Sequence, residues 1–395
     1  MPSTLIASPA VGEAAPEGAG TPAGSGKRRW LLIGAAAVVV IAIIGVAVFI
    51  LMGRSSSHPS YGAVGTFVVQ PTLDDVSSFS EGLAPAQRDG KWGFIDPTGN
   101  FVIAPQFDDA SGFSEGLAPV ELGDQWGFVD KTGAIVITPQ YSFLKYTTFS
   151  SGLAPVTKDS KTGYIDTTGM LKISPQYDSA YDFSEDLAPV KIDDKWGYID
   201  PNGKLVIAPQ YDSAYQFSEG LALVTVSDKM GFIDTSGAFA VNPQFSDAWS
   251  FSAGYAPVQT SGEWGFIDKT GEWTIPAQYE KAYGFSEGLA AVMKDGKWGY
   301  IKSSGDFAIE PTFAVKPFDP SASDPLYWIS DFTNGVASLM PADSAKVGLI
   351  DTEGQWVLRP SYSSIYGCSE GLAAVATTTD SNGYGSGPWG FISCG

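Results

Sequence analysis

Six glutamates recur at one place in a repeated Ser-Glu-Gly sequence, and clustered carboxylates could perform acid–base chemistry. They are Glu81, Glu115, Glu185, Glu219, Glu287 and Glu370. Glycoside hydrolysis would need one asymmetric pair of carboxyl groups separated by about 5–9.5 Å. These residues are copies of a single turn position, which Ser151, Ala253 and Asn334 occupy in other copies. We therefore predict that the chain has no catalytic residues and is not an enzyme.

Metal binding has little support in the residue types. The aspartate pairs Asp74-Asp75, Asp108-Asp109 and Asp193-Asp194 could attract Ca²⁺, which takes about 6–8 oxygen ligands. None of them has the spacing of a dedicated calcium loop, so we expect solvated turns. Two cysteines exclude a four-cysteine zinc site, and the single histidine, His58, lies in a Ser-rich stretch. We predict no metal and no cofactor.

Tryptophans are the better candidates for ligand contacts, because an aromatic ring can stack on a sugar. Most of them precede a glycine at a fixed place in the repeat, where Thr, Met or Val can replace them, so we expect these in the core. Trp249, Trp273 and Trp356 break this pattern. Trp249 aligns with Tyr181, Tyr215 and Tyr283, at a position that we expect to be half exposed.

An insertion within residues 314–331 adds a further candidate. It contains Tyr327 and Trp328, and insertions in repeat proteins usually form surface loops, often on a binding face. We predict that this pair is the main contact site. The alternative is a loop that packs on its own scaffold.

The two cysteines, Cys368 and Cys394, both lie near the carboxyl terminus. Outside a membrane they could form a disulfide that holds the final strands together. Cys368 also replaces a phenylalanine of the repeat, so a buried free thiol is the alternative.

Internal repetition determines which elements hold these residues. Phe-Ser-Glu-Gly-Leu-Ala or a variant begins at nine places, most of them 34 residues apart: Phe79, Phe113, Phe149, Phe183, Phe217, Phe251, Phe285, Phe332 and Cys368. Trp-Gly or a variant follows 13 residues after each of the first seven. The chain therefore contains nine copies of one unit.

Each unit reads as a three-stranded antiparallel meander. In one copy the extended runs are 187–192, 196–199 and 204–207, and turn-forming residues separate them. Asp200 can hydrogen-bond the backbone of its own turn, and Gly203 can adopt positive φ. No apolar period of 3.6 residues survives, so helical repeats are excluded.

The repeat resembles the bacterial WG (KWG) β-repeat family. Lys-Trp-Gly-Tyr/Phe-Ile-Asp is followed by Pro-Gln-Tyr/Phe-Asp and Phe-Ser-Glu-Gly-Leu-Ala, and 91–96, 195–200 and 297–301 match best. The resemblance covers about residues 66–395. It implies a repetitive β domain, often on secreted or membrane-tethered bacterial proteins, without an established catalytic activity.

Units this small must stack on one another to bury their aromatic faces. We expect an all-β open superhelical array of nine units; a closed, propeller-like ring is the alternative. Residues 66–71 resemble a third strand without a first or second, and the chain ends after a second strand, as ring closure would require. Three strands per unit and nine units both depart from ordinary propellers, which have about 4–8 four-stranded blades.

The amino-terminal fifth predicts a membrane anchor. Residues 1–29 read as a disordered cytoplasmic tail, 30–52 as one transmembrane helix of 23 uncharged residues, 53–65 as a flexible spacer and 66–395 as the repeat domain. The alternative is a cleaved signal peptide. Lys27, Arg28 and Arg29 precede the apolar segment, which favours a cytoplasmic amino terminus and an extracytoplasmic repeat domain at the plasma membrane.

The net charge of −20 limits the partners. Four basic and two acidic residues lie in 1–54, so the rest of the chain carries −22. Nucleic acid is therefore an improbable partner. We expect a membrane-tethered, non-catalytic scaffold that binds a protein or a cell-envelope glycan. The alternatives are a carbohydrate-active or peptidoglycan-processing enzyme and a structural spacer or calcium-dependent adhesin.

Overall fold

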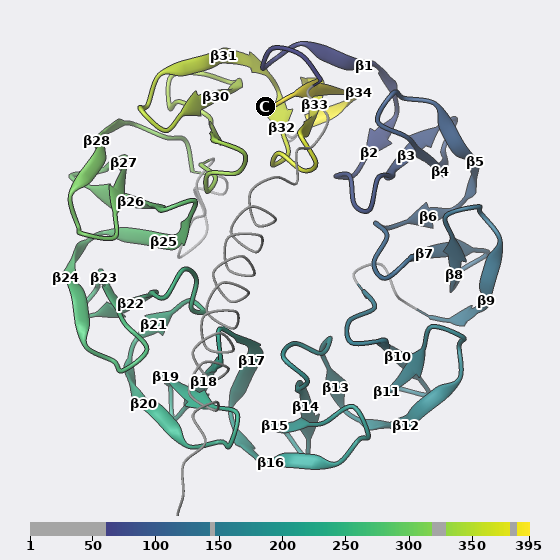
Figure 1. Cartoon of the computed structure of the whole chain (residues 1–395), viewed down its shortest axis with the longest axis horizontal. Helices are drawn as coiled ribbons and strands as arrows, with labels where there is room; N and C mark the ends of the chain where they lie inside the picture. The colour runs from purple at the N-terminus through teal and green to yellow at the C-terminus, as the bar shows by residue number, and fades with distance from the viewer. Residues whose placement is uncertain (1–60, 143–146, 318–328, 380–384) are drawn as a thin grey trace, which may run out of the picture. The chain divides into compact units, whose positions relative to one another are not determined.

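Short antiparallel strands joined by tight turns build the structure, which is a computed structural model. It describes residues 61–142, 147–317, 329–379 and 385–395. These ranges hold 34 strands, arranged in nine separate sheets, and contain no helix. The sheets follow one another around a ring within a single compact unit (Figure 1). We call the sheets blades 1 to 9, from the one that contains residues 84–88 to the one that contains residues 372–379.

Each blade has up to four strands, and these are ordered side by side from the centre of the ring to its rim (Figure 1). The innermost strands are β2 (Asp75–Val76), β6 (Asp109–Ala110), β13 (Ser179–Ala180), β17 (Ser213–Ser218), β21 (Asp247–Ala248), β25 (Lys281–Ser286) and β32 (Ser364–Ile365). The second strands are β3 (Ala84–Arg88), β7 (Leu117–Leu122), β10 (Leu153–Lys158), β14 (Ala188–Ile192), β18 (Leu221–Val226), β22 (Ala256–Thr260), β26 (Leu289–Lys294), β29 (Val336–Leu339) and β33 (Leu372–Thr379).

The outer half of each blade holds the Trp-Gly strand and the edge strand. The third strands are β4 (Lys91–Ile95), β8 (Gln125–Asp130), β11 (Lys161–Asp166), β15 (Lys195–Ile199), β19 (Lys229–Asp234), β23 (Glu263–Ile267), β27 (Lys297–Lys302), β30 (Val347–Asp351) and β34 (Gly385–Ser393). The outer strands are β5 (Phe101–Phe107), β9 (Ile135–Tyr141), β12 (Leu171–Tyr177), β16 (Leu205–Tyr211), β20 (Phe239–Phe245), β24 (Trp273–Tyr279), β28 (Phe307–Phe313), β31 (Trp356–Tyr362) and β1 (Phe67–Leu73).

The expected open superhelical array is wrong, because the ring is closed. Strand β1 pairs antiparallel with β34, so the first strand of the chain completes the last blade in the order β1-β34-β33-β32. Side chains also join blade 9 to blade 1: Ser369 Oγ donates to the Phe79 carbonyl at 2.7 Å, and the Glu370 carboxylate accepts the Gly82 N–H at 3.1 Å. Closure leaves no terminal blade with an exposed apolar face.

The three-stranded unit is also corrected. A fourth, innermost strand lies ahead of the three expected ones in most blades, and five of these strands have only two residues. The third strand expected, 204–207, is also longer than predicted, because the Pro-Gln-aromatic sequence after it lies inside the outer strand, as Pro209 does in β16. Proline is tolerated there because an edge strand has backbone N–H groups that need no ladder partner.

The core lies between neighbouring blades. In one cluster Trp92, Phe94 and Phe107 of blade 1 pack with Phe113 and Val129 of blade 2. The glycine after each tryptophan makes the outer strand's close approach possible. A Cβ on Gly197 would lie 2.5 Å from the Ile207 carbonyl oxygen, a distance that no side chain can occupy.

The described residues include no helix that is long and apolar enough to cross a membrane. The expected tail (1–29), transmembrane helix (30–52) and most of the spacer (53–60) lie outside the described residues. The first described residue is Tyr61.

Candidate ligand-binding site on the inner wall of the ring

The repeated Ser-Glu-Gly turn fastens each blade to the next. Glu81 Oε2 accepts the Gly116 N–H at 3.1 Å, and the same bond joins Glu185 to Gly220 at 2.9 Å. The serine before Glu185 adds a second bond, because Ser184 Oγ donates to the Phe217 carbonyl at 2.7 Å. These carboxylates therefore have a structural task between blades, and each faces backbone N–H groups.

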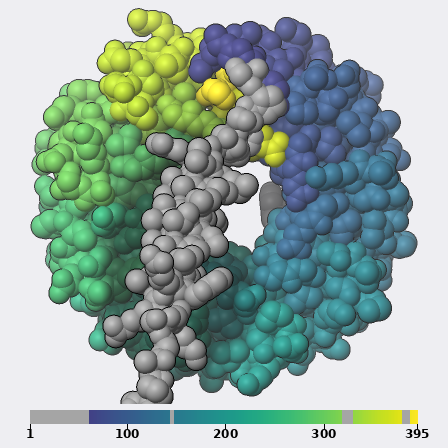
Figure 2. Space-filling model, in the orientation of Figure 1, coloured from purple at the N-terminus to yellow at the C-terminus, as the bar shows by residue number. Residues whose placement is uncertain are grey.

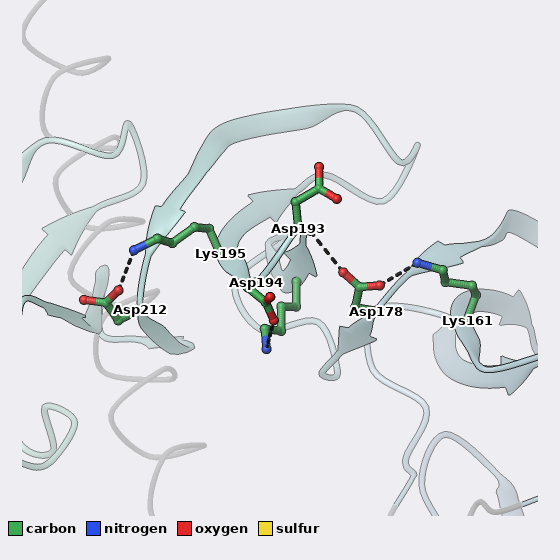
Figure 3. A network of polar contacts seen from close by, with 7 residues as sticks. Lys161, Asp178, Asp193, Asp194, Lys195 and Asp212 are labelled. Atoms are coloured by element: carbon green, nitrogen blue, oxygen red, sulfur yellow. Dashed lines mark hydrogen bonds and ion pairs between the residues drawn. The ribbon is translucent and has the colours of Figure 1, made fainter.

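A second polar network follows the opposite end of each blade. Asp178 accepts hydrogen bonds from Lys161 of blade 3 and from the Asp193 backbone of blade 4, and Asp212 pairs with Lys195 in the same way (Figure 3). The lysine partners hold the pKa of Asp178 and of Asp212 below the usual range of a carboxyl group. The aspartate pair at 193–194 is thus part of a hairpin turn, with Asp194 paired to Lys191.

The described residues contain no group of three or more histidine, cysteine, aspartate or glutamate side chains arranged to hold a metal ion. The acidic residues of the repeat are instead distributed singly along the blade contacts.

The two residues before the phenylalanine of each Phe-Ser-Glu-Gly sequence lie at the centre-facing edge of the blades. We call these pairs the inner wall; they are residues 77–78, 111–112, 147–148, 181–182, 215–216, 249–250, 283–284, 330–331 and 366–367. Figure 2 shows an open space in the middle of the ring. The inner wall is therefore the part of each repeat that a ligand entering this space would meet.

Several pockets follow the inner wall across successive blades, and two of them are larger than the one at blades 8 and 9. The first, of about 560 Å³, reaches from Thr148 of blade 3 to Ser250 of blade 6 and is lined by Tyr181, Asp182 and Tyr215 between them. The second, of about 620 Å³, reaches from Tyr366 of blade 9 to Thr148 of blade 3, and serine and threonine residues line it together with Phe79, Trp92 and Phe113. Both pockets therefore combine aromatic and hydroxyl side chains.

Asp182 is the centre of the polar contacts in the first pocket. Thr148 Oγ1 of blade 3 donates to its carboxylate at 2.9 Å, and Gln216 Nε2 of blade 5 donates to its backbone carbonyl at 3.3 Å. Burial raises the pKa of Asp182 above the usual range, and burial does the same for Asp331 in blade 8. Three successive blades therefore contribute hydrogen-bonding groups to one place.

Comparison with protein-family models identifies the repeat. The model described as "WG containing repeat" matches residues 64–92, 92–126, 126–161, 163–196, 196–229, 230–264, 264–298 and 348–377. The chain belongs to the WG repeat family. The resemblance seen in the sequence is thereby confirmed, and comparison with curated proteins finds no match.

Comparison with solved structures finds similar chains at low sequence identity. A eukaryotic initiation factor has a TM-score of 0.50 and 11% identity, with 78% of this chain and 91% of that chain covered. AztD from Citrobacter koseri has a TM-score of 0.41 and 13% identity, with 71% and 92% covered. Streptogramin B lyase has a TM-score of 0.34 and 17% identity, with 62% and 91% covered. Identities this low concern the fold alone.

The three tryptophans predicted as ligand contacts lie in different parts of the WG repeat ring. Trp249 lies on the inner wall of blade 6 and is 47% exposed. Trp273 and Trp356 begin the outer strands β24 and β31, at the rim, where they make edge contacts with Phe245 and Phe313. The structure therefore does not bring the three together. Tyr327 and Trp328 lie outside the described residues.

Cys368 and Cys394 are joined by a disulfide in blade 9. It connects the segment before the second strand to the end of β34, the strand that receives β1. The bond therefore fixes the blade in which the WG repeat ring closes.

Sequence reasoning missed most of the inner wall. It named Tyr181, Tyr215 and Tyr283 only because they align with Trp249. It did not name Asp182 or Gln216. The signal was the repeat alignment itself. The two positions before the phenylalanine differ from copy to copy, whereas the positions that clamp the blades are mostly the same.

Proposed function

We propose that this WG repeat ring is a non-catalytic binding module that holds its ligand on the inner wall, outside the cytoplasm. One observation carries the proposal. Positions that join blades repeat around the ring, but the inner wall changes from Ser77-Ser78 through Tyr181-Asp182 to Trp249-Ser250. A position that varies between copies of one unit, while the blade contacts stay the same, is free to provide specificity.

The carboxylates support a non-catalytic role. The recurring glutamates accept backbone hydrogen bonds from the next blade, as Glu219 does from Gly254 at 3.0 Å. Asp182 is held by Thr148. A general acid–base pair would need two carboxyl groups in different environments facing one substrate position, and the recurring glutamates have equivalent places in successive blades.

An extracytoplasmic location has two supports. The disulfide between Cys368 and Cys394 belongs to an oxidising compartment. The uncharged segment 30–52 and the basic residues before it are typical of a membrane anchor with its amino terminus inside the cell. We therefore propose that the anchored ring binds a protein or cell-envelope material.

Capture of cell-envelope components by the purified full chain tests this function. We expect material to be retained by the wild-type chain and lost when Tyr215→Ala and Trp249→Ala are combined on the inner wall. The matched control is Trp273→Ala, which removes an exposed aromatic ring from the rim and should leave capture unchanged. Equal capture by all three chains would remove the inner wall from the account.

A further inference from the structure

Four consecutive blades each present one aromatic ring on the inner wall. Tyr181, Tyr215, Trp249 and Tyr283 occupy the same repeat position in blades 4 to 7. The first three are 49%, 44% and 47% exposed, whereas the Trp-Gly tryptophans Trp196 and Trp298 are buried. We call these four residues the aromatic arc.

Two rings of the arc stack on tryptophans of their own blades. Tyr181 stacks on Trp196 of its own blade, with ring centres 5.1 Å apart and an angle of 3° between the planes. Tyr283 stacks on Trp298 at the same distance and 21°. One face of Tyr181 is thus covered by the Trp-Gly tryptophan, and the side chain stays 49% exposed, so its other face is available as a flat platform.

Hydroxyl groups of the preceding blades anchor the backbone of the arc. Tyr164 of blade 3 donates to the Tyr181 carbonyl at 2.8 Å, and Tyr198 of blade 4 donates to the Tyr215 carbonyl at 2.7 Å. The buried donors and their acceptors are thereby satisfied, so the platforms are held in place before any ligand arrives.

Polar groups lie between the first two platforms. The pocket that contains Tyr181 and Tyr215 also contains the carboxylate of Asp182, the amide of Gln216 and the hydroxyl of Thr148. All its described lining residues are neutral or acidic, so the pocket offers no cation to an anionic ligand. Flat apolar faces combined with side-chain hydrogen-bond acceptors and donors suit a molecule that has both C–H faces and hydroxyl groups.

We infer that the aromatic arc binds an uncharged pyranose oligosaccharide, with sugar rings stacked on successive platforms and hydroxyl groups bonded to Asp182 and Gln216. The inference rests on the proposed function and names the ligand class of the same site. A linear glycan fits because the platforms recur once per blade. A cationic peptide is the less favoured ligand, because Tyr181 is covered on one face by Trp196 and offers a single open face, which forms no cage around a cation. The net charge of −22 on residues 55–395 disfavours anionic polymers as ligands.

Calorimetric titration of the full chain tests the ligand class. The chain is kept in a detergent whose head group is not a sugar, and the probes are hexamers of β-1,4-glucose, α-1,4-glucose and β-1,4-N-acetylglucosamine. A galacturonate hexamer is the anionic control. We expect at least one uncharged hexamer to bind and the galacturonate hexamer to show no heat of binding.

Variants of the arc provide the second arm. We expect Tyr215→Ala to weaken binding by about tenfold or more, since it removes a platform, and Tyr215→Phe to keep affinity within about threefold, since the ring remains. Trp273→Ala at the rim should bind as the wild type does. Failure of all three uncharged hexamers to bind would overturn the inference, as would binding that Tyr215→Ala leaves unchanged.

The two failures are distinguishable. If no hexamer binds, but capture of envelope material still depends on Tyr215 and Trp249, the ligand is not a glycan and the proposed function stands. If a lysine-rich peptide binds and Asp182→Asn abolishes this binding, the ligand is likewise not a glycan and the proposed function stands. If capture is independent of the inner wall, the proposed function itself fails.

Discussion

Aspartate side chains occupy two opposite electrostatic environments within one repeat. Asp178 is exposed and paired with Lys161, which keeps the pKa of its carboxyl low. Four residues later, Asp182 lies on the inner wall, where burial raises the pKa of its carboxyl. The carboxyl group of Asp178, at the junction between blades, therefore loses its proton more easily than that of Asp182 on the inner wall.

These two shifts predict opposite pH dependences of stability. The folded state binds the Asp182 proton more tightly than the unfolded state, so its contribution to stability is present below the unfolded pKa and is lost as pH rises through the folded pKa. Asp178 contributes above its unfolded pKa and loses this contribution as pH falls through its lowered pKa.

Denaturant unfolding between about pH 3 and pH 8 measures both effects. We expect Asp182→Asn to be at least as stable as the wild type at the upper end and to lose relative stability as pH falls. Asp178→Asn, the matched control, should be less stable at the upper end and approach the wild type in acid. A parallel response of the two variants would contradict the assigned environments.

Glycine after tryptophan is a steric requirement. A methyl group on Gly197 would collide with two backbone atoms of β16, the Ile207 oxygen at 2.5 Å and the Pro209 nitrogen at 2.7 Å. Because backbone cannot move aside cheaply, Gly197→Ala should lower the free energy of unfolding by about 2–4 kcal/mol. Gly284→Ala is the control, since its Cβ would meet only Ser252 at 3.7 Å. Thermal denaturation of both variants decides the point.

At the scale of the blade, serine hydroxyls connect each inner segment to the next. Ser114 Oγ donates to the Phe149 carbonyl at 2.6 Å. Ser80 has the same place in blade 1, but its buried hydroxyl has no hydrogen-bond partner among the described residues. Ser114 and Ser80 therefore allow a serine hydroxyl that donates this hydrogen bond to be compared with one that does not.

Alanine substitution at these two serines separates the bond from its surroundings. Ser114→Ala should cost about 1 kcal/mol, because the Phe149 carbonyl loses its donor. Ser80→Ala should be neutral or slightly stabilising, because no bond is lost. Chemical denaturation gives both values, and equal losses would mean that the hydroxyl bond contributes nothing.

The three longer strands of each blade were predictable and the fourth was not. Turn residues such as Asp200 and Gly203 delimit strands of five to seven residues, and their hydrogen bonds and positive φ are those expected. The innermost strand of blade 4 is Ser179–Ala180, which is too short to produce an alternating pattern. It forms only because β14 offers an unpaired edge, a condition set by tertiary structure.

For the whole molecule, the failure to predict the innermost strand explains why an open array was expected in place of a ring. The complementary ends of the chain indicated closure, but a three-stranded unit argued against a propeller. Once β32 is counted, blade 9 has four strands, with β1 at its rim. The inner wall could not be predicted either, because closure is what turns one repeat position, such as that of Tyr181, into a continuous surface.

Ring closure is the claim on which the inner wall depends, and paired spin labels test it directly. Val102 in blade 1 and Val357 in blade 8 are exposed on outer strands, two steps apart through blade 9. Val136 in blade 2 and Val206 in blade 4 are also two steps apart and serve as the reference. All described cysteines are disulfide-bonded, so introduced cysteines take the labels. Electron–electron distance measurements should give similar distributions for the two pairs; a much longer distance between 102 and 357 would contradict the closed ring.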